Sequence, residues 1–155
     1  MRIRLCMAMI GCGLLAVRVL PALAALGDNV ASVSKDRVHL HAQLKGVTSS
    51  VGFTVHEIEA PAGTLIREYI SPSGTVFAVS WSGPTKPDLQ QLFGNYFSQY
   101  ASASSSVRHG GATRRHFEVK QPDLVVESNG RMRAFRGRAY VPSLMPSGVT
   151  PGDIR

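Results

Sequence analysis

Two similar turn motifs, eleven residues apart, divide the middle of the chain into short segments: residues 60–64 read APAGT and residues 71–75 read SPSGT. In each motif the proline fixes φ near −65° at the second turn position, and the glycine two residues later adopts the positive φ that reverses the chain. The flanking segments are rich in Val, Ile, Phe, Tyr and Thr, which are favoured in strands. Residues 52–59, 64–70 and 75–81 are therefore predicted to form an antiparallel meander.

An amphipathic helix is predicted directly after the meander. Pro87 and Asp88 are residue types favoured in the first turn of a helix. The following apolar residues recur at helical spacing, whereas alternate residues of the third strand place Phe77, Val79 and Trp81 on one face. We predict that the helix packs against this face and that the core contains Phe77, Val79, Trp81, Leu89, Leu92, Phe93, Tyr96 and Phe97.

The remaining segments complete an α+β pattern. Residues 28–47 have apolar positions at helical spacing and are predicted to form an N-terminal helix. Residues 113–120, 124–128 and 131–141 are predicted strands, and Asn129-Gly130 is predicted to be the two-residue turn of a C-terminal hairpin. The predicted fold is an antiparallel sheet of five to six strands packed by the amphipathic helix, with residues 25–145 as one domain and 146–155 as an extended tail.

The first 24 residues have the organisation of a secretory signal peptide. Arg2 and Arg4 precede a thirteen-residue apolar run, and Ala22-Leu23-Ala24 supplies the small residues of a cleavage site. The run is shorter than the roughly 20 residues that span a bilayer. We expect cleavage after Ala24, a periplasmic or secreted location, and no transmembrane segment after processing. A lipoprotein site ending at Cys12 is the weaker alternative, because the apolar run before that cysteine is too short.

Both cysteines of the sequence, Cys6 and Cys12, lie within this predicted signal peptide. The mature domain is therefore expected to be free of cysteine, which excludes disulfides, thiol nucleophiles and thiolate metal sites. Removing the three arginines at positions 2, 4 and 18 also lowers the formal charge from +7 to +4. Much of the basic character of the precursor thus belongs to the leader.

Several segments together resemble one known family. These are residues 54–58 (TVHEI), 67–69 (REY), 71–81 from Ser71 to Trp81, 87–89 (PDL) with Tyr96-Phe97, and 132–135 (MRAF) with 137–142 (GRAYVP). In these segments the chain is similar to the domain-of-unknown-function family numbered 2844, which comprises small exported proteins of Gram-negative bacteria. The resemblance covers residues 25–155. It implies a periplasmic or secreted single domain, and it implies no reaction and no catalytic residues.

The region from Arg108 to Arg138 contains eight basic and three acidic residues. Such a surface attracts phosphates of lipid headgroups, lipopolysaccharide or another envelope component, and it would bind nucleic acid only without sequence preference. On regular strands Arg131 and Arg133 would share one face and Arg136 and Arg138 the other. The alternative is a solvated basic edge that discourages pairing between sheets. The candidate anion-binding residues are Arg114, Arg115, Arg131, Arg133, Arg136 and Arg138.

A small periplasmic hydrolase is the alternative to a non-catalytic binding module. It would need a pocket in which at least two of the candidate acid–base groups converge: His56, Glu57, Glu68, Asp88 and His116. The sequence has no nucleophile elbow, phosphate-binding glycine loop, zinc-protease motif or calcium loop. His39 and His41 point apart on a helix, so no metal site and no cofactor are expected. The catalytic residues stay unassigned, and a binding module is the favoured function.

Overall fold

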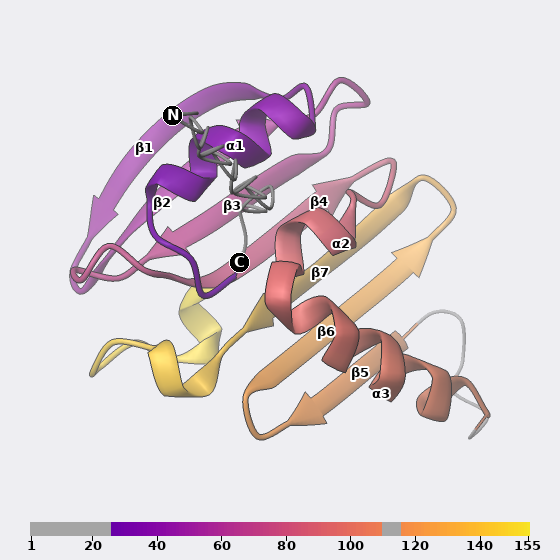
Figure 1. The fold of residues 1–155 in the computed structure, drawn as a ribbon. Helices are drawn as coiled ribbons and strands as arrows, with labels where there is room; N and C mark the ends of the chain where they lie inside the picture. The colour runs from indigo at the N-terminus through magenta and orange to yellow at the C-terminus, as the bar shows by residue number, and fades with distance from the viewer. Residues whose placement is uncertain (1–25, 110–115) are drawn as a thin grey trace, which may run out of the picture.

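One antiparallel seven-stranded sheet organises the chain, with the strand order β1-β2-β3-β4-β7-β6-β5 (Figure 1). The computed structural model describes residues 26–109 and 116–155, so the predicted signal peptide lies outside the described residues. The strands are β1 (Gln43–Ser50), β2 (Phe53–Glu59), β3 (Leu65–Ile70), β4 (Val76–Gly83), β5 (His116–Gln121), β6 (Leu124–Arg131) and β7 (Ala134–Tyr140). The α-helices are α1 (Ala31–His39), α2 (Leu89–Phe93) and α3 (Phe97–His109). The α+β class and the antiparallel sheet were predicted, but the number of strands was too low.

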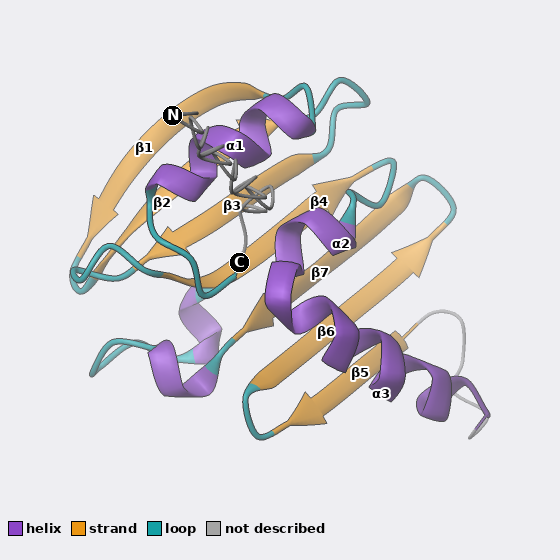
Figure 2. Ribbon diagram, in the orientation of Figure 1, coloured by secondary structure: helices purple, strands orange, loops and turns teal. Residues whose placement is uncertain are grey.

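The sheet consists of two meanders joined by the pairing of β4 with β7, in which Ala78 lies opposite Tyr140 and Gly83 opposite Phe135. All three helices lie on one side of it: α1 covers the β1–β3 half, and α2 and α3 cover the half formed by β5, β6 and β7 (Figure 2). We call the other side of the sheet the open face. The final residues of the chain, 142–155, pack against part of that face.

The two proline–glycine turns have the predicted conformation. Gly63 and Gly74 adopt φ values of 80° and 83°. The backbone N–H of Ala60 donates to the carbonyl of Thr64 at 2.9 Å, and that of Ser71 donates to the carbonyl of Thr75 at 2.8 Å. The β2–β3–β4 meander is thereby confirmed.

The predicted helix over residues 28–47 is wrong in its second half. The helix α1 ends at His39, His41 takes a φ of 50°, and residues 43–50 form β1, which pairs with β2 from Gln43↔Glu59 to Ser50↔Phe53. Without β1, the backbone donors and acceptors along the outer edge of β2 would have no protein partners. This pairing outweighs the helical spacing, and it is why the sheet has more strands than predicted.

The amphipathic helix is interrupted. The carboxylate of Asp88 caps α2 by accepting from the backbone N–H groups of Gln90 and Gln91 at 2.9 and 3.2 Å. Gly94, with φ 46° and ψ −117°, then ends α2, and a 3₁₀ turn at Gly94–Tyr96 leads into α3. Only glycine adopts such a conformation readily, so one periodic pattern becomes two helical pieces.

Phe77 lies on the opposite side of the sheet from the predicted one. Tyr69 pairs with Ala78 and Ile70 with Val76, which leaves Phe77 as the extra residue of a β-bulge. The bulge reverses its orientation, so Phe77 packs with Phe53 and Tyr69 on the open face, at ring-centroid distances of 6.1 and 6.2 Å. The other residues predicted for the core lie on the helix-covered side: Val79, Trp81, Leu92 and Phe93 are buried, and Leu89, Tyr96 and Phe97 are partly buried against them.

Residues 146–155, predicted as an extended tail, fold back onto the open face. Pro151–Asp153 forms a 3₁₀ turn closed by Thr150 and Asp153, and Ile154 is only 1% exposed. Ile154 packs in a second apolar cluster with Tyr69, Phe77, Ala78, Val125 and Tyr140. An apolar anchor at the last position but one explains why the proline-rich segment does not extend into solvent.

Candidate functional site

The strand register gathers polar side chains at the centre of the open face. Arg136 and Arg138 are two residues apart on β7 and therefore share a side of the sheet. Arg138 lies opposite Ser80 of β4 and Glu127 of β6, whereas Arg136 lies opposite Ser82 and Asn129. Arg67 of β3 pairs with Ser80 and joins the same face. A cleft of about 620 Å³ opens there, and we call it the basic cleft; its polar walls include Arg67, Ser82, Asn129, Arg136, Arg138 and Arg155.

Arg138 is a structural residue rather than a solvated cation. Its Nη2 and Nε lie 2.8 and 3.0 Å from the carboxylate Oε2 of Glu127. Its Nη1 donates to the backbone carbonyls of Pro151 and Ile154. Because three hydrogen-bond partners surround the guanidinium, it fastens the final segment of the chain to the sheet.

Arg67 has a similar arrangement. Its Nε lies 2.6 Å from Oε2 of Glu57, and its Nη1 donates to the backbone carbonyl oxygen of Arg155 at 3.2 Å. The hydroxyls of Tyr69 and Ser80 donate to the same oxygen at 2.7 and 2.8 Å. Two of the arginines in the basic cleft therefore already have carboxylate partners.

Arg136 differs from both. Its side chain is exposed, and within residues 26–109 and 116–155 it has no ion-pair partner. It also borders a second cleft of about 350 Å³, the hairpin cleft, whose walls are His116, Asn129, Gly130, Arg131, Ala134 and Arg136. There the Nδ1 of His116 lies 2.8 Å from Oδ1 of Asn129. The guanidinium of Arg136 can therefore bind an anion, and it lies between the basic cleft and the hairpin cleft.

The turn of the C-terminal hairpin was predicted at the wrong position. Arg131 pairs with Ala134, so the two-residue turn is Met132-Arg133, and Asn129 and Gly130 belong to β6. A Cβ at Gly130 would lie 2.9 Å from the ring of Phe135, which explains the glycine at that position. With this register Arg131 shares the open face with Arg136 and Arg138, contrary to the predicted separation. Arg114 and Arg115 lie outside the described residues.

Of the five groups that a hydrolase could use, His56 of β2 and Glu68 of β3 lie opposite each other in the sheet, but they do not share a cleft with each other or with the rest. Glu57 lies on the open face, in a third cleft of about 430 Å³ beside Arg67, whereas His116 borders the hairpin cleft. Glu68 is buried beneath the helices, and Asp88 caps α2. His56 is partly buried, which lowers the pKa of its imidazole. None of these three clefts contains two of the five candidate groups.

A buried acidic pair on the helix-covered side escaped the sequence prediction. Asp36 of α1 accepts a hydrogen bond of 2.7 Å from the Gln91 amide, and Glu68 of β3 is 1% exposed. Burial raises the pKa of Asp36 to about 6, against the opposing hydrogen bond. Burial, and then the negative charge of Asp36, raises the pKa of Glu68 well above its ordinary value. The signal was available, because Ile66 and Ile70 flank Glu68 on the same face of a strand.

Two further observations concern metals and membranes. Within the described part of the chain, no three His, Cys, Asp or Glu side chains are grouped closely enough to hold a metal ion. The helices in these same ranges are too short or too polar to cross a bilayer.

Comparisons with known proteins give one match. No curated protein and no solved structure matches the chain significantly. The family described as "Protein of unknown function (DUF2844)" matches residues 22–154, which include all the strands and helices above. Because this match extends over most of the sequence, the chain belongs to the DUF2844 family of proteins of unknown function.

Proposed function

We propose that this protein is an exported, non-catalytic binding module that holds an anionic group of an envelope component on its β6–β7 hairpin. The observation that carries the proposal is the position of Arg136, an exposed guanidinium without an ion-pair partner in the described residues, between the basic cleft and the hairpin cleft. Export is proposed from the organisation of residues 1–24.

The surroundings of Arg136 suit an oxyanion. Its planar guanidinium presents several donors in a geometry that matches phosphate and carboxylate oxygens. Ser82 and Asn129 lie directly opposite it on the neighbouring strands and offer a hydroxyl and an amide. Arg131 borders the same hairpin cleft and adds a second exposed positive charge. Phosphate groups of lipids, of lipopolysaccharide or of another envelope polymer share this chemistry.

Arg136→Gln tests the proposal in solution. We expect inorganic phosphate, titrated against the native protein, to shift the backbone amide resonances of Ser82, Asn129 and Gly137, and these shifts to weaken as salt is added. The variant should bind phosphate about ten-fold more weakly, because one charged hydrogen-bonding group is lost. Its free energy of unfolding should change by less than about 0.5 kcal/mol, since an exposed, unpaired side chain contributes little to stability.

The matched control is Arg37→Gln, which removes one exposed positive charge from α1 on the helix-covered side. This variant should bind phosphate as the native protein does. An equal loss in both variants would mean that only net charge matters, and the proposed site would be wrong.

Processing is tested separately by the intact mass of protein recovered from an expressing Gram-negative cell. We expect a chain that begins at Ala25, carries no lipid and is released with the periplasmic contents. A mass that includes Met1, or acylation at Cys12, would contradict the proposed export route.

A further inference from the structure

The tip of the β6–β7 hairpin exposes a large apolar side chain. Met132 is 92% exposed at the first position of the two-residue turn, between Arg131 and Arg133, whose side chains are also exposed. Burying a methionine side chain would stabilise the folded protein, and the exposed position in this turn provides no such stabilisation. Val51, at 98%, has comparable exposure, but no basic residue lies in its turn.

The backbone at this tip is also unfavourable for the residue present. Arg133 has a φ of 60°, in the left-handed region that glycine and asparagine adopt most easily. Any residue with a Cβ is less stable than glycine in this conformation, because the Cβ approaches the following carbonyl oxygen too closely. The tip therefore has an arginine at a position where the backbone conformation favours glycine.

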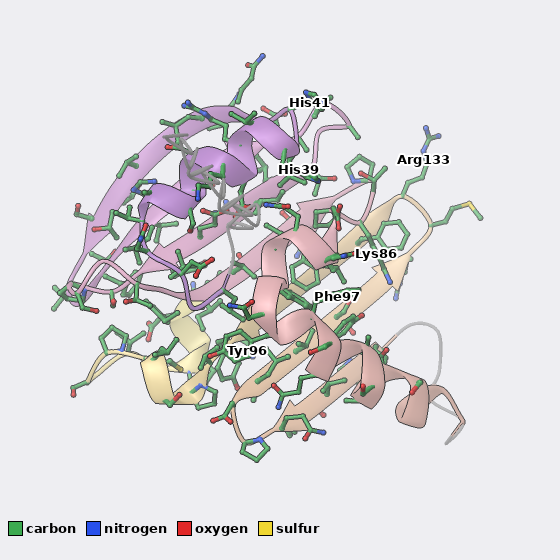
Figure 3. The ribbon with its side chains drawn as sticks, in the orientation of Figure 1. His39, His41, Lys86, Tyr96, Phe97 and Arg133 are labelled. Carbon is green, nitrogen blue, oxygen red and sulfur yellow. The ribbon has the colours of Figure 1, made fainter. Side chains whose placement is uncertain are left out.

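Positive charge surrounds the tip on both sides of the sheet. Arg131 and Arg136 lie on the open face, beside the hairpin cleft. On the helix-covered side, the Nζ of Lys86, from the loop after β4, lies 5.6 Å from the ring centre of Phe135. Figure 3 shows Lys86 and Arg133 at the same end of the molecule. From Ser128 to Ala139 the hairpin contains four arginines and no acidic residue.

We propose that this end of the protein docks onto a bilayer with anionic headgroups, so that Met132 enters the boundary between headgroups and acyl chains while Lys86, Arg131, Arg133 and Arg136 contact headgroup phosphates. The charge component rests on the proposed function, whereas the bilayer is a new element. A soluble anion could pair with the arginines, but it would leave the apolar side chain of Met132 exposed to water. A membrane surface satisfies both, because its outer layer is anionic and an apolar region lies directly beneath.

The first test compares Met132→Ser with Val51→Ser in co-sedimentation with vesicles of phosphatidylglycerol and phosphatidylcholine. Removing Met132 should weaken vesicle binding about ten-fold through the lost apolar burial. Val51 lies in the β1–β2 turn at the other end of the strands, so its replacement should leave binding unchanged. Equal binding by Met132→Ser and native protein would overturn the proposal, while the phosphate test of Arg136 would still decide the proposed function.

Arg133→Gly separates binding from stability. Glycine relieves the left-handed backbone, so the melting temperature should rise by about 3 °C. The loss of one cation near an anionic surface should lower vesicle affinity about five-fold. A purely structural role for this arginine would leave vesicle affinity unchanged, and that result would contradict the inference.

Met132→Trp reports insertion directly. Its emission should shift to shorter wavelength when phosphatidylglycerol vesicles are added and should stay constant with vesicles of phosphatidylcholine alone. The native protein provides the control, because its single tryptophan, Trp81, is 2% exposed and should not respond to vesicles. Emission that stays at the wavelength of a solvated indole with the bound anionic vesicles would overturn the proposed insertion.

Discussion

Trp81→Ala is expected to lower the free energy of unfolding by roughly 3–5 kcal/mol, the usual cost of truncating a buried aromatic side chain. Trp81 is 2% exposed, and its ring lies 6.0 Å from that of Phe93 in α2. On the other side the indole covers Gly137 of β7, where a Cβ would overlap the ring. The side chain therefore joins the helices to the centre of the sheet, and removing it leaves a cavity at the junction of the two meanders.

Trp81→Phe is the matched variant. Phenylalanine keeps most of the apolar contact and removes the indole Nε1, which has no hydrogen-bond partner among the described residues. Its cost should be clearly smaller than that of alanine, because a buried donor without a partner is itself unfavourable. Urea unfolding followed by circular dichroism measures both variants without relying on the lost fluorescence. A loss below about 1 kcal/mol for alanine would show that the helices do not pack on Trp81.

The stability of the folded protein is expected to decrease as the pH rises from about 4 to about 6. Burial raises the folded pKa of Asp36 from 3.8 to about 6, so between these values the folded state retains a proton that the unfolded chain has released. Stability is then greatest below the unfolded pKa and is lost as the pH rises through the folded pKa. A pKa shift of this size lowers the free energy of unfolding by about 3 kcal/mol between pH values below 3.8 and above 6. The raised pKa of Glu68 has the same sign and therefore also lowers stability as the pH rises.

Asp36→Asn should remove much of this dependence and raise the free energy of unfolding at pH 8 by up to about 3 kcal/mol. The asparagine oxygen still accepts the hydrogen bond from Gln91, so the buried contact is kept. Asp123→Asn, at an exposed position before β6, controls for the loss of one carboxylate. Urea unfolding at pH 4, 6 and 8 measures the profile. A native protein that becomes more stable across this range would contradict the raised pKa of the pair.

Local chemistry determined which parts of the fold were predictable. The turns at residues 60–64 and 71–75 depend on proline and glycine within five residues, and the meander was predicted from them. Strand β1 was not predicted, because it is an edge strand whose side chains are mostly exposed and do not alternate between buried and exposed positions. The prediction of a turn at Asn129-Gly130 was wrong because both residues pair with β7, Asn129 with Arg136 and Gly130 with Phe135, so the chain reverses at Met132-Arg133.

The positive charge of the candidate site was predictable from the sequence, but which arginines form ion pairs was not. The excess of arginine after residue 108 is evident in the sequence, and Arg136 and Arg138 do lie on one wall of a cleft. Whether an arginine is available depends on partners distant in sequence. Glu127 and the carbonyls of Pro151 and Ile154 bind the guanidinium of Arg138, whereas no carboxylate of the described residues forms an ion pair with Arg136. Composition therefore identified the region, and only the register distinguishes its binding candidate from its structural arginine.

The attachment of residues 151–155 to the open face also determines the order in which the domain can fold. Ribosomes synthesise these residues after every strand of the sheet, yet Ile154 completes the second apolar cluster and the Arg155 carbonyl accepts from Tyr69 and Ser80. Contacts that join residues 69 and 155 close a long loop, and such contacts form late and slowly. The apolar cluster and the hydrogen bonds beneath the basic cleft therefore cannot be complete until Ile154 and Arg155 have been synthesised.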